Sequence, residues 1–169
     1  MWIFSEAAAG ETYRINFADV DGNTLSTADG HITIVVLVNK ANIDKAHAVG
    51  DRIPDFCLIN PMYRMITVLA FEKNHSKLVR ALLSSLMLRR VDSEARQLQA
   101  RYDRLKITRN ARQDVFAAAD FDGAIITQLK SQWSAELFRV FVFGRNGELL
   151  KQWNDVPSGE ELAVALKQN

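Results

Sequence analysis

Seven consecutive residues, 32–38, have the sequence ITIVVLV, in which one threonine is the single polar side chain. Such β-branched residues favour an extended strand, and a strand without polar alternation is buried on both of its faces. A similar run, YRMITVLAF, occupies residues 63–71. Residues 42–59 between them leave room for a crossover helix that is short or broken, because Gly50 and Pro54 interrupt it. The two runs together predict a mostly parallel central sheet.

The rest of the chain alternates between strand and helix patterns. Apolar residues at spacings of three and four from residue 78 to residue 105 predict one long helix, or two with a break near residues 90–93, where Ser93 would cap the second. Its apolar positions begin with Leu78, Val79, Leu82, Leu83 and Leu86 and continue on the inward face with Val91, Ala95, Leu98, Tyr102 and Leu105. The other expected elements are strands at 12–17 and 115–119, a short helix at 124–133, a hairpin of 139–143 with 148–153, and a final helix capped by Ser158.

The composition is that of one folded domain without cross-links. The 169 residues are 48% hydrophobic and 24% charged, and no Gly-, Ser- or Pro-rich linker divides them. We therefore expect a single domain over residues 1–169, with its core at about residues 12–168. Cys57 is the only cysteine, which excludes an intramolecular disulfide, a CxxC redox pair and a cysteine zinc cluster.

Targeting signals are weak. No apolar run approaches the length that crosses a bilayer, so no membrane span is expected. The first ten residues, MWIFSEAAAG, lack a basic region and fail as a signal peptide, but they also fit the end of a trimmed precursor. The compartment therefore stays open. The cytoplasm is favoured, and an extracytoplasmic location follows if such a precursor exists.

Motifs for nucleotide, metal and hydrolase chemistry are absent from the sequence. It contains no GxxxxGK[ST], GxGxxG or GxSxG motif. The three histidines, His31, His47 and His75, lack the spacing of metal ligands, so no metal and no other cofactor is expected.

Two groups of carboxylates are better explained by turns than by chemistry. Asp19, Asp21 and Asn23 surround Gly22, but the glycine and glutamate positions of a calcium loop are not met. Asp120 and Asp122 precede a glycine in the same way and fit the start of a helix better than a catalytic pair.

Three stretches carry a resemblance to a known superfamily: FADVDGNTLS before the first long strand, DFDGAIITQLKSQW, and FRVFVFGRNGELL in the hairpin. Their order resembles the thioredoxin-like superfamily, in its branch of TlpA-like and peroxiredoxin-like proteins. The resemblance implies a three-layer α/β/α sandwich, with a central mixed sheet, helices on both faces, and a C-terminal β-hairpin and helix.

The resemblance also implies where the redox site of such a protein would lie. Its CxxC would follow the first long strand, where this chain has no cysteine, and its cis-proline would precede the hairpin strand, where this chain has Phe138. The degenerate active-site loop implied in this way comprises Asn39, Lys40, Asn42, Asp44, His47 and Phe138. A groove at this loop is also a candidate for small-molecule binding.

Cys57 lies almost twenty residues beyond the end of the first long strand, among apolar neighbours. A thiol in such surroundings is an inert core residue. The alternative is a reactive thiol whose pKa is lowered by Arg52 and Arg64 nearby in the sequence.

Positive charge is concentrated between residues 77 and 112. This segment has ten lysines and arginines and three acids, a net charge of +7, whereas the remainder has eleven bases and seventeen acids, a net charge of −6. The candidates for partner binding on the long helix are Arg89, Arg90, Arg96, Arg101 and Arg104.

The basic helix has three interpretations. It is a solvated face neutralised by local pairs such as Asp92 with Arg96, a surface for an acidic protein partner, or a surface that forms a homodimer with the acidic remainder of a second copy. Nucleic acid is not expected, because no exposed aromatic residues are interleaved with the arginines. The sequence as a whole predicts a non-catalytic binding or assembly module, and the alternative is a peroxiredoxin-like antioxidant that uses Cys57 alone.

Overall fold

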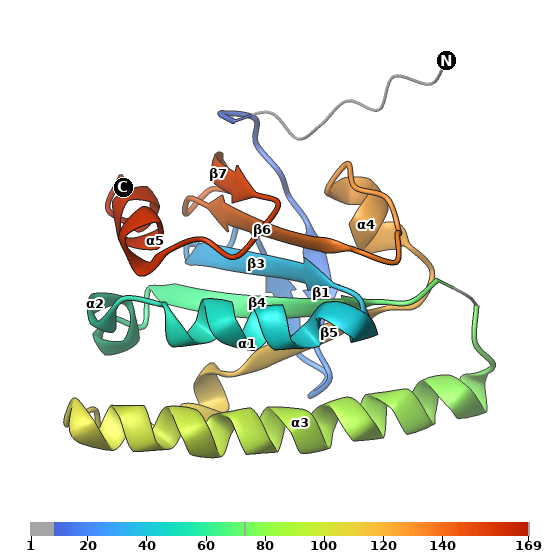
Figure 1. Cartoon of the computed structure of the whole chain (residues 1–169), viewed down its shortest axis with the longest axis horizontal. Coiled ribbons are helices and arrows are strands. Elements are labelled where there is room, and N and C mark those ends of the chain that lie inside the picture. The colour runs from blue at the N-terminus through green and yellow to red at the C-terminus, as the bar shows by residue number, and fades with distance from the viewer. Residues whose placement is uncertain (1–8, 73, 169) are drawn as a thin grey trace.

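The computed structural model describes residues 9–72 and 74–168, so the predictions for the first eight residues lie outside it. A five-stranded sheet is at its centre (Figure 1). Its strands, from one edge to the other, are β5 (Phe116–Asp120), β4 (Tyr63–Ala70), β3 (Ile32–Val38), β6 (Phe138–Phe143) and β7 (Leu149–Trp153). The strands β3, β4 and β5 are parallel, and β6 and β7 are antiparallel to their neighbours. The predicted mixed α/β fold is confirmed.

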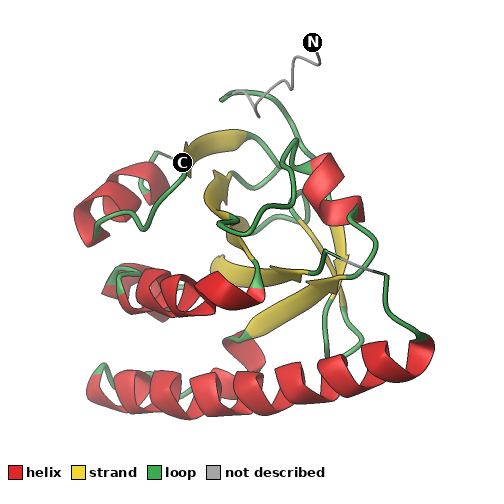
Figure 2. Ribbon diagram, turned by 45° about the vertical axis from the view of Figure 1, so that its right-hand side comes forward, coloured by secondary structure: helices red, strands yellow, loops and turns green. Residues whose placement is uncertain are grey.

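Helices cover both faces of this sheet (Figure 2). One face carries the helices α1 (Ile43–Asp51), α2 (Asp55–Ile59), α3 (Lys77–Arg104) and α5 (Gly159–Leu166). The other carries α4 (Ala124–Gln128) and a hairpin of β1 (Asn16–Ala18) with β2 (Thr24–Ser26). Two short turns of helix, η1 (Lys40–Asn42) and η2 (Ala111–Asp114), complete the chain.

Every residue of β3 is buried, as its sequence predicted. Val35 and Leu37 point into the core under α4, whereas Ile34 and Val36 point into the core under α1 and α5. In the register of the sheet Val35 lies between Ile66 of β4 and Phe141 of β6. A strand with apolar side chains on both faces is stable here because each face has its own layer.

Helix boundaries follow local sequence where a cap is encoded. Ser158 and Glu161 form a reciprocal capping box at the start of α5. The predicted crossover is indeed broken, into α1 and α2, with Pro54 immediately before the first residue of α2.

Two predicted elements differ from the structure, and for the long helix the structure selects one of the two predicted alternatives. The strand expected at 12–17 keeps the predicted alternation of burial, but its regular ladder covers only β1. The helix expected at 124–133 ends at Gln128, because Lys130 takes a positive φ of 50°. No break occurs near residues 90–93, and Ser93 lies in the middle of the continuous helix α3.

One face of β4 is less covered than its sequence predicted. Its residues alternate between buried and half-buried, and Met65, Thr67 and Leu69 are among the half-buried ones. The expectation of a strand covered on both faces is therefore wrong for the side of β4 that faces α3.

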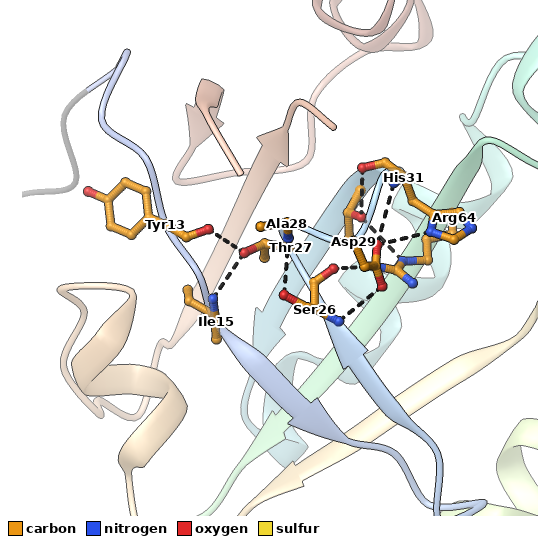
Figure 3. A network of polar contacts seen from close by, with 9 residues as sticks. Tyr13, Ile15, Ser26, Thr27, Ala28, Asp29, His31 and Arg64 are labelled. Carbon is orange, nitrogen blue, oxygen red and sulfur yellow. Dashed lines mark hydrogen bonds and ion pairs between the residues drawn. The ribbon is translucent and has the colours of Figure 1, made fainter. Parts of the chain in front are cut away.

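The hairpin β1–β2 is joined to the sheet by the buried arginine of β4, Arg64 (Figure 3). Its Nη2 donates to the carbonyl of Ser26 and, at 2.8 Å, to Oδ1 of Asp29, and its Nε donates to Oγ1 of Thr33 at 3.2 Å. Burial of Asp29 raises its pKa, but hydrogen bonds from Arg64, His31 and the Ser26 amide outweigh this and lower the pKa to about 2. The ionised pair therefore holds two parts of the fold together.

Candidate functional site

Two asparagines occupy the loop at the end of β3. Asn39 is buried, and its Oδ1 accepts a hydrogen bond from the backbone amide of Asn42 at 3.1 Å. Its Nδ2 donates to the carbonyls of Ser134 at 2.9 Å and Ala135 at 2.8 Å. The side chain of Asn42 donates to the carbonyl of Leu137 at 3.3 Å. The loop after β3 and the segment before β6 are therefore tied together by side-chain amides.

Phe138 is the first residue of β6 and lies opposite Val38, the last residue of β3. Its ring is buried, and Nζ of Lys45 lies 5.3 Å from the ring centroid. No cis peptide bond occurs in residues 9–72 or 74–168. The backbone before β6 is therefore trans at the place where the resemblance implied a cis-proline.

The remaining residues of the predicted loop lie elsewhere or point to solvent. Lys40 is exposed. Oδ1 of Asp44 lies 3.7 Å from Nη2 of Arg90, on α3. His47 contacts two carboxylates, with Nδ1 at 2.8 Å from Oε2 of Glu94 and Nε2 at 3.4 Å from Oδ2 of Asp51. The structure thus brings Asn39, Asn42 and Phe138 together, and it directs Asp44 and His47 toward α3.

Comparison with solved structures relates this architecture to known folds. The pneumococcal exposed lipoprotein thioredoxin of Streptococcus pneumoniae matches with a TM-score of 0.58, over 92% of this chain and 99% of its own, at 12% identity. A DsbF homologue from Corynebacterium diphtheriae matches with a TM-score of 0.55, over 98% of this chain and 90% of its own, at 9% identity. StoA from Bacillus subtilis matches with a TM-score of 0.52, over 94% and 99%, at 12% identity. This chain has the thioredoxin-like fold.

The thioredoxin-like assignment rests on structure alone. No family model matches the chain, and no curated protein matches its sequence. Within this thioredoxin-like fold the chain has one cysteine, so it has no CxxC pair at any position. The predicted resemblance is confirmed at the level of the fold.

Cys57 lies in α2, away from the loop that follows β3, and it is 4% exposed. Burial raises the pKa of its thiol to about 12, although Arg101 lowers that pKa in part. The two arginines expected beside it are engaged elsewhere: Arg52 donates to the carbonyl of Pro157 at 3.0 Å, and Arg64 holds Asp29. The expectation that these two arginines lower the pKa of Cys57 is therefore wrong.

The other histidines make local contacts. Nδ1 of His31 lies 2.9 Å from Oδ1 of Asp29, and the ring of His75 packs edge-on against Phe71 at 5.6 Å. Within the described part of the chain, no three His, Cys, Asp or Glu side chains are grouped so as to hold a metal ion.

The two carboxylate groups shape the backbone, as predicted. Oδ1 of Asp19 accepts hydrogen bonds from the amides of Asp21 at 3.0 Å and Asn23 at 2.7 Å. Asp120 accepts from the amide of Ile126 at 2.8 Å, and Asp122 from that of Ala124 at 3.2 Å, at the start of α4.

The five arginines predicted for partner binding fall into three groups. Arg101 turns toward α1 and α2, where it donates to the carbonyl of Ile53 and to Oδ1 of Asp55, so its expected outward direction is wrong. Arg90 lies near Asp44 and Glu94. The side chains of Arg89, Arg96 and Arg104 are exposed and make no hydrogen bond or ion pair with any residue that the structure describes.

The expected pair of Asp92 with Arg96 does not form. Oδ1 of Asp92 instead accepts a hydrogen bond from Nε of Arg112 at 2.7 Å, and Arg112 also binds Asp21. Asp92 therefore does not neutralise Arg96, which stays unpaired among the described residues.

Sequence analysis missed the exposed leucines of α3. Leu78 is 83% exposed, Leu82 61% and Leu86 50%, although Val91 and Tyr102 on the same helix are buried. Residues spaced by four advance 40° around a helix beyond each full turn, which carries these leucines to the side away from the sheet. A helical-wheel projection of α3 separates the exposed leucines from the buried group that includes Val91 and Tyr102. This projection could have identified the exposed leucines from the sequence.

We call this surface the outward α3 face. It consists of Leu78, Val79, Leu82, Leu86, Arg89 and Arg96. The apolar part lies in the first half of the helix and the unpaired arginines follow it. In residues 9–72 and 74–168 no helix combines the length and the apolar character that crossing a membrane requires.

Proposed function

We propose that the chain is a non-catalytic thioredoxin-like module that binds another protein through the outward α3 face. The observation that carries this proposal is the exposure of three leucines on a helix that also buries a separate apolar face. Contiguous exposed apolar surface on a soluble domain marks interaction sites. The loop after β3 contains no thiol, and hydrogen bonds from the side-chain amides of Asn39 and Asn42 close it. Both observations support a role without redox chemistry.

The charges around these leucines support an acidic partner. Residues 74–91 contain four lysines and arginines and no acid. Arg89 and Arg96 have no counter-ion among the described residues, so a partner carboxylate would displace no internal ion pair. A second copy of the chain offers the same cations at a symmetric interface and thus supplies no opposite charge. The partner we expect therefore carries an apolar stripe flanked by aspartates or glutamates.

Replacing Cys57 with serine is expected to change no enzymatic activity. A pKa of about 12 leaves about one thiol in 10⁵ ionised at pH 7, too few for a peroxidatic or exchanging thiolate. Disulfide reduction and peroxide consumption by wild type and Cys57→Ser should both equal the buffer background, with a CxxC thioredoxin assayed alongside as the positive control. Turnover by wild type that the serine variant lacks would favour the single-cysteine antioxidant instead.

Reversing charge on the outward α3 face is expected to weaken partner binding at least tenfold. The double variant Arg89→Glu/Arg96→Glu brings like charges against the acidic partner, and Leu82→Ser removes apolar contact. Partners captured by the immobilised chain are purified and titrated by calorimetry at two salt concentrations, and affinity should fall as salt rises.

The matched control is Arg145→Glu/Lys151→Glu, which changes the same charges on a different part of the surface. A partner that binds the α3 variants as tightly as wild type refutes the proposal. So does sedimentation of the chain with phosphatidylglycerol vesicles in the absence of any protein partner, or a stable dimer by light scattering that Leu82→Ser abolishes.

A further inference from the structure

A cavity of about 560 Å³ lies between β4 and the helices on that side of the sheet. Its wall includes Met65 and Leu69 of β4, Cys57 of α2, and Val91 and Leu98 of α3. Pockets that hold small organic molecules usually measure roughly 300–1,000 Å³ and are mostly apolar. The size and lining of this cavity are therefore those of a ligand site.

Polar contacts between residues of the cavity wall join α3 to α1 and to the segment before α2. Nδ1 of His47 on α1 lies 2.8 Å from Oε2 of Glu94 on α3. Arg101 of α3 donates a hydrogen bond to the carbonyl of Ile53, between α1 and α2. Beyond the end of α3, Arg109 donates to the carbonyl of Ile59 at 3.1 Å. These contacts are made by long side chains, and the face of β4 that carries Met65 and Leu69 remains half-covered.

The charged groups at the cavity favour an anion. Five arginines line it, and four of them, Arg64, Arg90, Arg101 and Arg109, are already paired with carboxylates. Arg101 and Arg109 already donate to carbonyls and carboxylates. Arg104, at the last turn of α3, also lines the cavity and has no partner among the described residues. An anionic group at Arg104 would supply the missing counter-charge.

We propose that this cavity binds a small amphiphile with a flexible apolar tail and one carboxylate head, of the class of medium-chain fatty acids. The tail lies against Met65, Leu69 and Leu98, and the carboxylate lies at Arg104. This site is separate from the outward α3 face, so its failure and the failure of the proposed function are distinguishable.

Calorimetric titration with octanoate, decanoate and dodecanoate, each below its micelle concentration, tests the tail. Each added methylene that is buried strengthens binding about fourfold, so decanoate should bind about fifteen times more tightly than octanoate. Decyltrimethylammonium has the same tail and the opposite charge, and it should bind at least tenfold more weakly than decanoate. Absence of saturable one-to-one binding, or equal affinity for the cationic amphiphile, overturns the proposal.

Variants place the ligand within the cavity. Met65→Trp fills the tail site and should weaken decanoate binding at least tenfold, and Leu98→Phe provides a second filling variant if the first does not fold. Arg104→Gln should weaken decanoate about fivefold and leave decanol unaffected, whereas the matched control Arg96→Gln changes neither. If both filling variants bind decanoate as wild type does, or if Leu82→Ser abolishes its binding, the ligand lies elsewhere and the proposal is wrong.

Discussion

Replacing Arg64 with methionine is expected to lower the free energy of unfolding by about 3 kcal/mol at pH 7. The methionine keeps much of the side-chain volume but removes every hydrogen bond to Ser26, Asp29 and Thr33. The Arg64 side chain is only 6% exposed, so its hydrogen bonds to the Ser26 carbonyl and to Thr33 lie away from bulk water, whereas Asp29 is 31% exposed and regains part of its hydration. Urea denaturation followed by circular dichroism measures the loss.

The pH dependence of stability identifies the cause of that loss. The pKa of Asp29 is about 2 in the folded protein, below its ordinary value of 3.8. A lowered folded pKa stabilises the protein above about pH 4, and this contribution, about 1 kcal/mol once solvent screening of the part-exposed carboxylate is allowed for, is lost as the pH falls toward 2. Wild type should show this acid-induced loss and Arg64→Met much less of it.

The exposed arginine Arg145 supplies the control. Arg145→Met is expected to change stability by less than about 0.5 kcal/mol and to keep the acid-induced loss. Suppose that Arg64→Met is as stable as wild type at pH 7 and loses the same stability as the pH falls toward 2. The hairpin β1–β2 would then be held by its apolar contacts alone.

Replacing Asn39 with alanine is expected to cost about 2–3 kcal/mol of unfolding free energy. The substitution leaves the carbonyls of Ser134 and Ala135 without their amide donor and removes the acceptor that caps η1. Because these bonds join two loops, their loss should also speed hydrogen exchange at least tenfold at two amides: that of Leu137, which donates to the Ser134 carbonyl, and that of Asn42, which donates to Oδ1 of Asn39. Chemical denaturation and exchange mass spectrometry provide the two measurements.

Asn74→Ala, at an exposed asparagine, is the matched control and should leave both quantities unchanged. Exchange at the Leu137 and Asn42 amides that is as slow in Asn39→Ala as in wild type would contradict the conclusion that side-chain amides close the loop. The same variant should leave partner binding through the outward α3 face intact, because the two surfaces lie on different elements.

The sequence predicted the sheet and the end of the chain because both are encoded locally. The run at residues 32–38 has no polar alternation, so its burial on two faces follows from its composition. Ser158 and Glu161 are three residues apart and form a capping box whatever surrounds them. The lack of a CxxC pair was equally certain, since the sequence has one cysteine.

Only the tertiary structure decided which surfaces are available for function. Leu82 and Val91 are both apolar residues of α3, and their different burial depends on which side of the helix meets β5. Arg101 and Arg96 are equally basic, and only the position of α2 determines that one is bonded and the other free. Contacts between segments distant in sequence depend on how whole layers pack against one another. A local sequence pattern does not predict the energies of such packing. The strands of the central sheet, the final cap and the missing thiols therefore follow from local sequence, whereas the exposed leucines, the unpaired arginines and the cavity beside β4 depend on packing.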